Sequence, residues 1–312
     1  MQLIFLGTGA GRPSKSRNVT SIAFSLADPN VGFWLFDAGE ATQHRLLETK
    51  LKLNKLDNVF ITHLHGDHLY GLPGLLSTRT YYEGAGKLRL FGPTGLRAYL
   101  EGVFAHSGAH LNYELEIHEV EPGRIYEDHR CVVTAAALEH RIACFGYRIE
   151  EKPLPGPLDL AKLIALGVPL GPLYGKLKRG EDATLPDGRL IRSADVVGSS
   201  VRGRTVAILG DTMPCDDAVL LARDADLLVH EATFASGMEE KAEAYGHSTF
   251  RQAAAVAAGA GAKRLVVTHF SSRYDEEAVA RLAREAMDAF PAIEPAHDGL
   301  RVDIARREEC MG

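Results

Sequence analysis

The chain has few cysteines and no long apolar run. Its four cysteines form no C-x-x-C pair and are scattered as Cys131, Cys144, Cys215 and Cys310. Scattered single cysteines are typical of a reduced compartment, so we expect a cytoplasmic protein. No apolar run reaches the roughly 20 residues that cross a bilayer. The N-terminus, MQLIFLGTGAG, lacks a charged n-region and a cleavage site, so we expect no signal peptide.

An excess of basic residues is also missing. The formal net charge of the 312 residues is −6, which counts mildly against a nucleic-acid substrate. It does not exclude one, because phosphate binding depends on local patches rather than on total charge. Hydrophobic residues make up 46% of the chain, and its 14 prolines and 31 glycines are spread along it. This composition predicts a folded protein with one large core or two modest ones.

Short apolar runs of strand length recur along the chain and are separated in places by helical patterns. We expect strands at 3–7, 21–26, 32–37, 58–62, 131–136, 205–210, 227–231 and 264–269. We expect helices at 40–49, 93–101, 215–223, 248–260 and 275–289, the fourth capped by Ser248 or Thr249. Clustered strands with interspersed helices predict an α/β protein, a layered αββα domain over residues 1–312.

Residues 151–180 differ from the rest of the chain. They contain five prolines and end in a basic cluster. We interpret this stretch as a partly helical insertion that projects from the core, rather than as a separate domain.

Four of the apolar runs end in an imidazole or a carboxylate. NVFIT leads into His63, TVAILG into Asp211, LLV into His230 and Glu231, and RLVVT into His269. In sheets packed against helices, functional groups collect at strand ends, where loops gather them into one cleft. The pattern therefore predicts a polar site built from several strands.

The densest group of metal-binding side chains is the segment THLHGDH. His63 and His65 are two residues apart and can face the same way at the end of an extended strand. Gly66 permits a tight turn, after which Asp67 and His68 arrive from a second direction. Imidazole nitrogen and carboxylate oxygen suit Zn(II), with Mn(II) or Fe as alternatives. Four ligands so close together predict a division between two ions.

The pattern H-x-H-x-D-H resembles the signature of the metallo-β-lactamase superfamily. The resemblance implies a sandwich of two mixed sheets with helices outside and metal ions at the sheet ends. It also implies two zinc-binding sets that share Asp211, namely His63, His65 and His140, and Asp67, His68 and His269. Two neighbouring ions would lower the pKa of a shared water, which suits phosphodiester hydrolysis. The superfamily also cleaves lactams, thioesters and sulfates, so the motif predicts a reaction class and not a substrate.

Three further segments resemble the ribonuclease Z family within that superfamily. The first matches its P-x-K-x-R-N loop and contains Lys15, Arg17 and Asn18. Lys15 and Arg17 alternate with small residues, so both could face a phosphate backbone. Charge alone would favour an ordinary basic surface loop.

The second segment combines the sequences HEAT at 230–233 and HST at 247–249. The resemblance implies that Glu231 orients His247, which donates a proton to the leaving 3′ oxygen. It gives Asp67 the role of proton acceptor for the attacking water. Without the resemblance, Glu231 would fit a salt bridge and His247 a helix N-cap.

The third segment is the insertion at 151–180, which is similar to the flexible arm that clamps the tRNA elbow in that family. Phosphate contacts would come from its basic end, that is from Lys176, Lys178 and Arg179. Such an arm would let an acidic protein bind RNA, although a solvated basic turn would look the same.

The sequence thus predicts a zinc-dependent endoribonuclease with two Zn(II) ions per subunit, or Mn in their place. It would cut precursor tRNA at the 3′ side of the discriminator nucleotide, leaving a 3′-hydroxyl on the tRNA and a 5′-phosphate on the trailer. The resemblance implies a homodimer, and we expect no membrane partner. One alternative is a small-molecule phosphodiesterase or arylsulfatase of the same superfamily, which would need neither the arm nor the P-x-K-x-R-N loop. Another is a non-catalytic RNA-binding protein with a structural metal site.

Overall fold

The computed structural model describes residues 1–26 and 32–306, and the chain forms two compact units. The larger unit comprises Met1–Glu150 and Thr205–Ala305. The smaller unit comprises Glu151–Arg204 together with Arg306. Cys310 lies outside the described residues.

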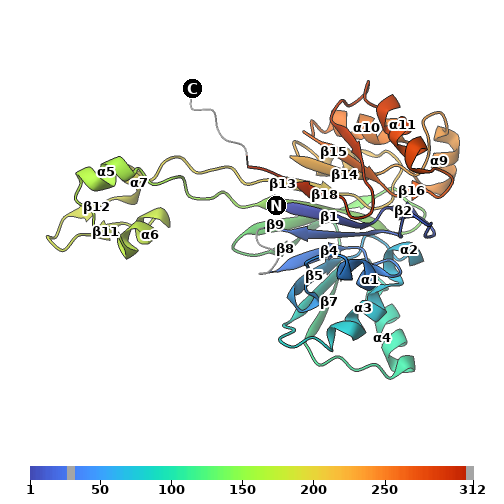
Figure 1. Ribbon diagram of the computed structural model, residues 1–312, viewed down its shortest axis with the longest axis horizontal. Helices are drawn as coiled ribbons and strands as arrows, with labels where there is room; N and C mark the ends of the chain where they lie inside the picture. The colour runs from blue at the N-terminus through green and yellow to red at the C-terminus, as the bar shows by residue number, and fades with distance from the viewer. Residues whose placement is uncertain (27–31, 307–312) are drawn as a thin grey trace. The chain divides into compact units, whose positions relative to one another are not determined.

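Two mixed sheets lie face to face in the larger unit (Figure 1). In the described residues each has seven strands. The first has the order β18 (Arg301–Asp303), β1 (Gln2–Gly7), β3 (Ser21–Ser25), β4 (Phe33–Phe36), β5 (Leu56–Phe60), β6 (Leu88–Gly92) and β7 (Leu115–Glu119). The second has the order β17 (Ile293–Pro295), β15 (Leu265–Thr268), β14 (Leu227–Glu231), β13 (Thr205–Ile208), β10 (Cys144–Glu151), β9 (Cys131–Leu138) and β8 (Gly123–Glu127). A short parallel pair, β2 (Gly9–Ala10) and β16 (Phe270–Ser271), lies beside them.

Helices cover the outer face of each sheet (Figure 1). The first sheet is covered by α1 (Thr42–Leu47), α2 (Gly66–Leu69), α3 (Leu72–Arg79) and α4 (Leu96–Ser107). The second is covered by α8 (Asp216–Leu221), α9 (Glu239–Tyr245), α10 (Phe250–Gly259) and α11 (Glu276–Glu285). The predicted layered αββα architecture is therefore confirmed.

The main core lies between the two sheets and is rich in aromatic rings. Phe60 stacks on Phe36 and on Phe91, with ring centroids 4.9 Å apart in both pairs. Tyr147 of the opposite sheet donates a hydrogen bond from its hydroxyl to the Ile61 carbonyl oxygen (2.6 Å). Because helices cover the outer faces, strands such as β14 bury both of their sides. This explains why they read as continuous apolar runs rather than as alternating patterns.

All eight expected strands and all five expected helices are present, with ends displaced by a few residues. Thr249, one of the two expected caps, receives the Gln252 amide hydrogen at the start of α10 and closes a capping box. The polar strands β7 and β8 lie at sheet edges. They were not predicted from the sequence because their exposed sides carry charged residues. Helix α3 includes a proline and a glycine, and it forms where its leucines are buried against the first sheet.

The smaller unit has a hydrophobic core of its own. It contains α5 (Leu160–Ala165), α6 (Pro172–Lys178), α7 (Ser193–Val196), β11 (Ala183–Thr184) and β12 (Leu190–Ile191). Its buried side chains include Leu163, Leu177 and Ile191. Backbone hydrogen bonds join Leu154 to Val201 in both directions (2.9 and 3.0 Å). The unit thus begins where the insertion was expected to begin and continues past residue 180 to Arg204.

None of the helices in residues 1–26 and 32–306 combines the length and hydropathy that a membrane crossing requires.

Candidate metal centre

The ends of strands from both sheets meet at one polar site. From the first sheet, β5 leads into His63, and α2 carries Asp67 and His68. From the second sheet, β9 leads to His140, β13 to Asp211, and β15 directly into His269. The seven residues that the superfamily resemblance assigns as ligands therefore lie together, although they come from four separate segments of the chain.

The first set of potential ligands is His63, His65, His140 and Asp211. The Nδ1 atom of His65 lies 3.0 Å from Nε2 of His63 and 3.2 Å from Nε2 of His140. Nε2 of His63 lies 3.6 Å from Oδ2 of Asp211. Four ligands at Zn–N distances of about 2.05 Å in a tetrahedron would lie roughly 3.4 Å apart. The spacing of these atoms therefore suits one divalent ion.

The second set is Asp67, His68 and His269, and Asp211 faces it as well. Nε2 of His269 lies 3.2 Å from Nε2 of His68 and 3.3 Å from Oδ2 of Asp67. Oδ2 of Asp211 lies 3.4 Å from Nε2 of both His68 and His269. The same Asp211 oxygen thus faces both sets, as a bridging carboxylate would.

Hydrogen bonds on the far side of the rings fix which nitrogen of each imidazole faces the centre. Nδ1 of His140 donates to the Gly246 carbonyl (2.6 Å), and Nδ1 of His68 donates to Asp37 (2.7 Å). The Thr62 hydroxyl donates to Asp37 (2.9 Å) and so accepts from Nδ1 of His63 (2.9 Å).

His269 is oriented in the same way. The Thr233 hydroxyl donates to Glu231 (2.8 Å) and accepts from Nδ1 of His269 (2.8 Å). In the neutral, metal-binding form of all four rings, Nε2 then carries the lone pair that faces the centre. Such outer hydrogen bonds are what metal-binding histidines require.

The electrostatics of the site also suit cations. Burial lowers the pKa of His63, His65 and His140, which keeps these rings neutral and able to bind a metal. Burial also opposes a charge on His68, but Asp211 and Asp37 raise the pKa of that ring well above its usual value. A site with such an excess of carboxylate charge would stabilise a bound divalent ion.

Asp37 is a functional residue that sequence reasoning missed. It follows the buried strand β4 and accepts hydrogen bonds from the Thr62 amide (2.7 Å), the Thr62 hydroxyl and His68. Its backbone has φ 59°, and that of His269 has φ 60°. Left-handed backbone at residues other than glycine is uncommon and concentrates at functional sites. The available signal was a fifth apolar run, 32–37, which also ends in a carboxylate.

A buried Glu231–His247 pair adjoins the two ligand sets. Oε1 of Glu231 lies 3.0 Å from Nδ1 of His247, and it also accepts from the amides of Thr212 and Ser248. Burial opposes a charge on His247, but the hydrogen bond to Glu231 raises the pKa of the imidazole to about 9. His247 is thus held in its protonated form, at 3.8 Å from Oδ2 of Asp211.

Comparison with known proteins identifies this arrangement. Residues 1–151 match the family model of the anti-Pycsar protein Apyc1, and residues 178–270 match the β-lactamase superfamily domain. Ribonuclease Z of Bacillus licheniformis is 50% identical over 306 residues, which cover 98% of this chain and 100% of that protein. The chain belongs to the ribonuclease Z family. Ribonuclease BN of an Enterobacter species is 50% identical over 305 residues, covering 97% of this chain and 100% of that protein.

A solved structure supports the same conclusion. The short form of human tRNase Z superimposes with a TM-score of 0.72 at 30% identity, covering 98% of this chain and 100% of that one. The metallo-β-lactamase fold expected from the sequence is confirmed, and this ribonuclease Z family member is a metal-dependent hydrolase.

The P-x-K-x-R-N loop of this ribonuclease Z family member contains both exposed and buried residues. Lys15 is exposed. Arg17 is buried, and its guanidinium donates to Thr8 (2.6 Å) and to Glu276 (2.7 Å). Asn18 donates from its side chain to the Glu40 carbonyl (2.7 Å). Of the three residues of this loop that were expected to contact RNA, Lys15 is exposed, whereas the side chains of Arg17 and Asn18 form hydrogen bonds within the protein.

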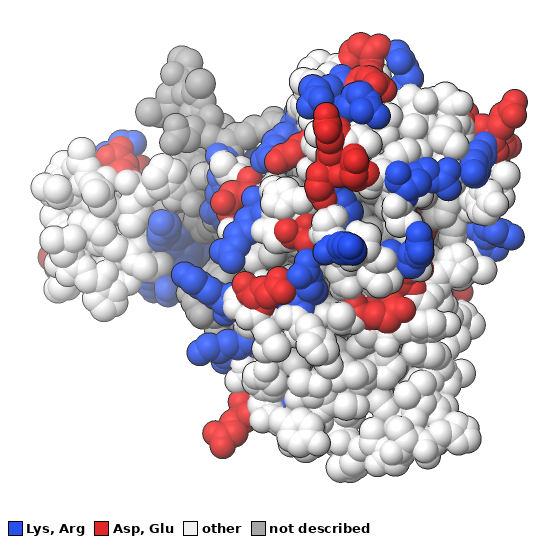
Figure 2. Space-filling model, turned by 45° about the vertical axis from the view of Figure 1, so that its right-hand side comes forward, with Lys and Arg blue, Asp and Glu red and all other residues white. Residues whose placement is uncertain are grey.

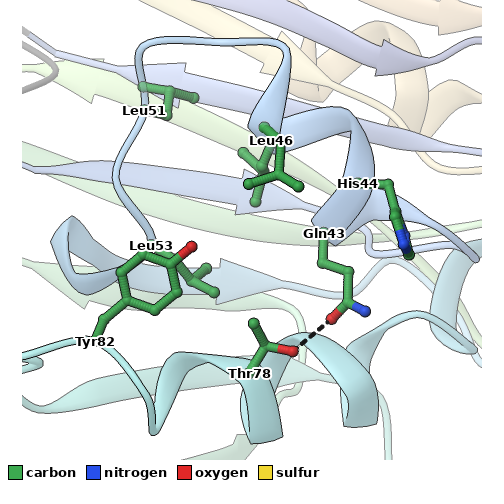
Figure 3. Close-up of a pocket in the computed structure, with 8 residues that line it drawn as sticks. Gln43, His44, Leu46, Leu51, Leu53, Thr78 and Tyr82 are labelled. Carbon is green, nitrogen blue, oxygen red and sulfur yellow. Dashed lines mark hydrogen bonds between the residues drawn. The ribbon is translucent and has the colours of Figure 1, made fainter.

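An open pocket of about 330 Å³ gives access to the centre. Asp67, His247 and His269 lie among its lining residues, and the amide of Gly11, which also lines it, donates a hydrogen bond to Asp67 (2.7 Å). A second hollow of about 170 Å³ lies between α1 and α3, lined mainly by leucines together with Gln43, His44, Thr78 and Tyr82 (Figure 3). The Thr78 hydroxyl donates a hydrogen bond to the Gln43 side chain there (2.8 Å). The described residues that line this hollow include no carboxylate. The chemistry of the family therefore belongs to the first pocket.

Proposed function

We propose that this chain is a zinc-dependent endoribonuclease that cuts precursor tRNA directly after the discriminator nucleotide. The product tRNA would carry a 3′-hydroxyl and the trailer a 5′-phosphate. The observation that carries the proposal is the meeting, in one pocket, of two His/Asp sets that share Asp211 with the Glu231–His247 pair. It is supported by 50% identity to proteins named ribonuclease Z over nearly the whole chain.

Two Zn(II) ions per subunit would be held by the two ligand sets, with Mn(II) as an alternative. Bound there, the ions supply a Lewis acid that lowers the pKa of water and offsets charge on the scissile phosphate. Asp67 lines the pocket and would accept the proton of the attacking water. Burial raises the pKa of Asp67, but the hydrogen bond to His269 and the interaction with His68 outweigh it and lower the pKa, so the carboxylate is ionised and able to act as a base.

His247 would act from the opposite side of the phosphate as the proton donor. Its raised pKa keeps a proton available near neutral pH, and Glu231 holds the ring by Nδ1. Proton transfer to the 3′ oxygen would assist its departure as the P–O bond breaks. Asp67 and His247 then have complementary roles, and their environments push their pKa values apart.

The smaller unit supports an RNA substrate by its charge. Residues 151–204 carry nine Lys and Arg against six Asp and Glu, a net charge of +3 in a chain of net charge −6. Among the described residues, Lys176 and Lys178 form no ion pair, whereas Arg179 pairs with Glu181 (2.9 Å). On the face drawn in Figure 2, basic and acidic side chains of the larger unit are interspersed. Phosphate binding by the arm would therefore rest on local groups, above all on the two lysines.

Replacement of the arm tests the substrate. The backbone bonds between Leu154 and Val201 bring the two chain segments together, so residues 155–200 can be exchanged for a short Gly-Ser linker without cutting through the core of the unit. We expect kcat/KM for precursor tRNA to fall on the order of 100-fold, because phosphate contacts are lost. Hydrolysis of bis(p-nitrophenyl) phosphate should be unchanged. Equal activity on both substrates before and after the exchange would favour a small-molecule phosphodiesterase.

An Asp67→Ala variant tests the catalytic proposal against a non-catalytic RNA-binding protein. Cleavage should be lost while precursor tRNA binding, measured by filter retention, persists. Undiminished cleavage would contradict the role given to Asp67. Absence of any cleavage by the unmutated chain with Zn(II) or Mn(II) would favour the RNA-binding protein.

We further propose a homodimer in the cytoplasm. The dimer is carried over from the family resemblance, and light scattering of the full chain tests it. The cytoplasmic location is supported by the thiols of Cys144 and Cys215, which form no disulfide among the described residues, as is typical of a reducing compartment.

A further inference from the structure

One wall of the active-site pocket consists of residues that no ligand set or proton-transfer role uses. Phe234 follows β14, Lys241 and Tyr245 come from α9, and Arg273 follows β16. All four line the same hollow as Asp67 and His247. Their chemistry, two aromatic rings and two cations, differs from that of the metal-binding floor.

The aromatic part of this wall has an exposed ring backed by a buried one. The Tyr245 side chain is 50% exposed, whereas Phe234 is 4% exposed. Their ring centroids are 6.2 Å apart with a tilt of 39°. The guanidinium of Arg273 lies over the other ring, 5.2 Å from the Phe234 centroid. An exposed aromatic side chain fixed by a buried neighbour offers a surface on which a nucleobase can stack.

The charged part of the wall is not neutralised by the protein. Among the described residues neither Lys241 nor Arg273 forms an ion pair, and Arg273 donates from Nε only to Ser271 (2.9 Å). Lys241 and Tyr245 are four residues apart in α9 and therefore lie on the same face of the helix. Unpaired cations beside an aromatic ring are the usual means of holding single-stranded nucleic acid, with the cations on phosphates and the ring on a base.

The position of His247 indicates which nucleotide this wall receives. His247 follows Tyr245 by two residues, and its ring centroid lies 6.1 Å from that of Phe234. The 3′ oxygen that accepts the proton from His247 belongs to the nucleotide on the 5′ side of the cut. That nucleotide must therefore lie on the same side of the phosphate as His247 and its aromatic neighbours.

We propose that the wall formed by Tyr245 and Phe234, flanked by Lys241 and Arg273, binds the unpaired base of the discriminator nucleotide. This inference rests on the proposed function, because it takes the orientation of the substrate from the proton-donor role of His247. Tyr245 supplies the stacking surface, and the two cations hold the adjacent phosphates. The wall would then be the element that fixes the cut to the 3′ side of this nucleotide.

Fluorescence of 2-aminopurine tests the proposal, since the fluorescence of this base falls when it stacks. One precursor tRNA carries the probe at the discriminator position and another carries it at the first trailer nucleotide. Asp67→Ala protein prevents cleavage during the titration, and unmutated protein in EDTA provides a second uncleaving sample. We expect quenching of the discriminator probe and little change in the trailer probe.

Substitutions at Tyr245 show whether the quenching comes from this wall. In the Asp67→Ala background, Tyr245→Ala should abolish the quenching and weaken binding about tenfold, the effect typical of one lost base stack. Tyr245→Phe should retain both, because the ring remains. Tyr81→Ala is the matched control, since Tyr81 is 87% exposed and lies outside the pocket.

The outcomes separate this inference from the function on which it rests. Normal cleavage after the discriminator, combined with quenching only of the trailer probe, would overturn the inference alone. So would a Tyr245→Ala variant that behaves like Tyr81→Ala. If the unmutated chain failed to cleave precursor tRNA at all, the proposed function and the inference would both fall.

Discussion

Substitution of Glu231 by Gln should move the alkaline limit of the pH–rate profile. Glu231 is the first group that raises the pKa of His247, which reaches about 9 even though burial of the ring opposes it. A proton donor is active below its pKa and loses activity as the pH rises through it. Without the carboxylate charge, the pKa of His247 should fall towards the ordinary histidine value of about 6.5.

The size of the effect follows from the fraction of His247 that is protonated. At pH 8 a pKa of about 9 leaves roughly 90% of the ring protonated, and a pKa of about 6.5 leaves roughly 3%. The expected loss of kcat/KM is then about 30-fold at pH 8 and less than about twofold at pH 6. Gln also presents an NH₂ group to donors such as the Thr233 amide, so a loss of about 1–3 kcal/mol in the free energy of unfolding should accompany it.

The assay is kcat/KM for precursor tRNA between pH 5.5 and 9.5, with thermal unfolding recorded for each protein at each pH. Glu240→Gln, at an exposed position on α9, is the matched control and should leave the profile unchanged. A uniform loss of activity at every pH, with no movement of the alkaline limb, would refute the assignment of His247 as the proton donor.

Three further predictions concern the metal centre, the arm and the core. Asp37→Ala should weaken metal binding about 10- to 100-fold, because His68 and Thr62 lose their common hydrogen-bond acceptor. Competition with a chromophoric chelator measures this affinity, and an unchanged affinity would mean that Asp37 does not orient the His68 ring. Replacing both Lys176 and Lys178 by Ala should reduce the slope of log kcat/KM against log salt by about 2 for precursor tRNA. An unaltered slope would show that neither lysine contacts phosphate. Phe60→Ala should lower the free energy of unfolding in urea by about 3–5 kcal/mol, since Phe60 stacks between two rings, and a loss below about 1 kcal/mol would contradict its place in the core.

The parts of the fold that could be predicted from sequence are those with a strong local pattern. Strands such as β14 are buried on both faces and therefore appear as apolar runs of the right length. Edge strand β7 alternates polar residues, and α3 contains Pro73 and Gly74, so their formation depends on neighbours that the sequence does not display.

The same division applies to the site. The ligand segment from His63 to His68 is local and specific, and its partners could be assigned by the family resemblance. Asp37 accepts hydrogen bonds from Thr62 and His68, and only the folded chain brings it close to these two residues. Arg17 is of a residue type that commonly contacts phosphate, but the fold buries its side chain, which forms an ion pair with Glu276. Tyr245 belongs to none of the motifs found in the sequence, and its position in the pocket results from the way α9 packs.

The central claim is that the two His/Asp sets load two ions and direct cleavage to one phosphodiester bond of precursor tRNA. The most direct test maps the 3′ end of the product from one precursor and measures the metal content of the same protein sample by plasma mass spectrometry. Two zinc or manganese ions per chain and a single product ending in the discriminator 3′-hydroxyl are expected. A fully loaded chain that leaves the precursor intact, or that cuts at scattered positions, would contradict the claim.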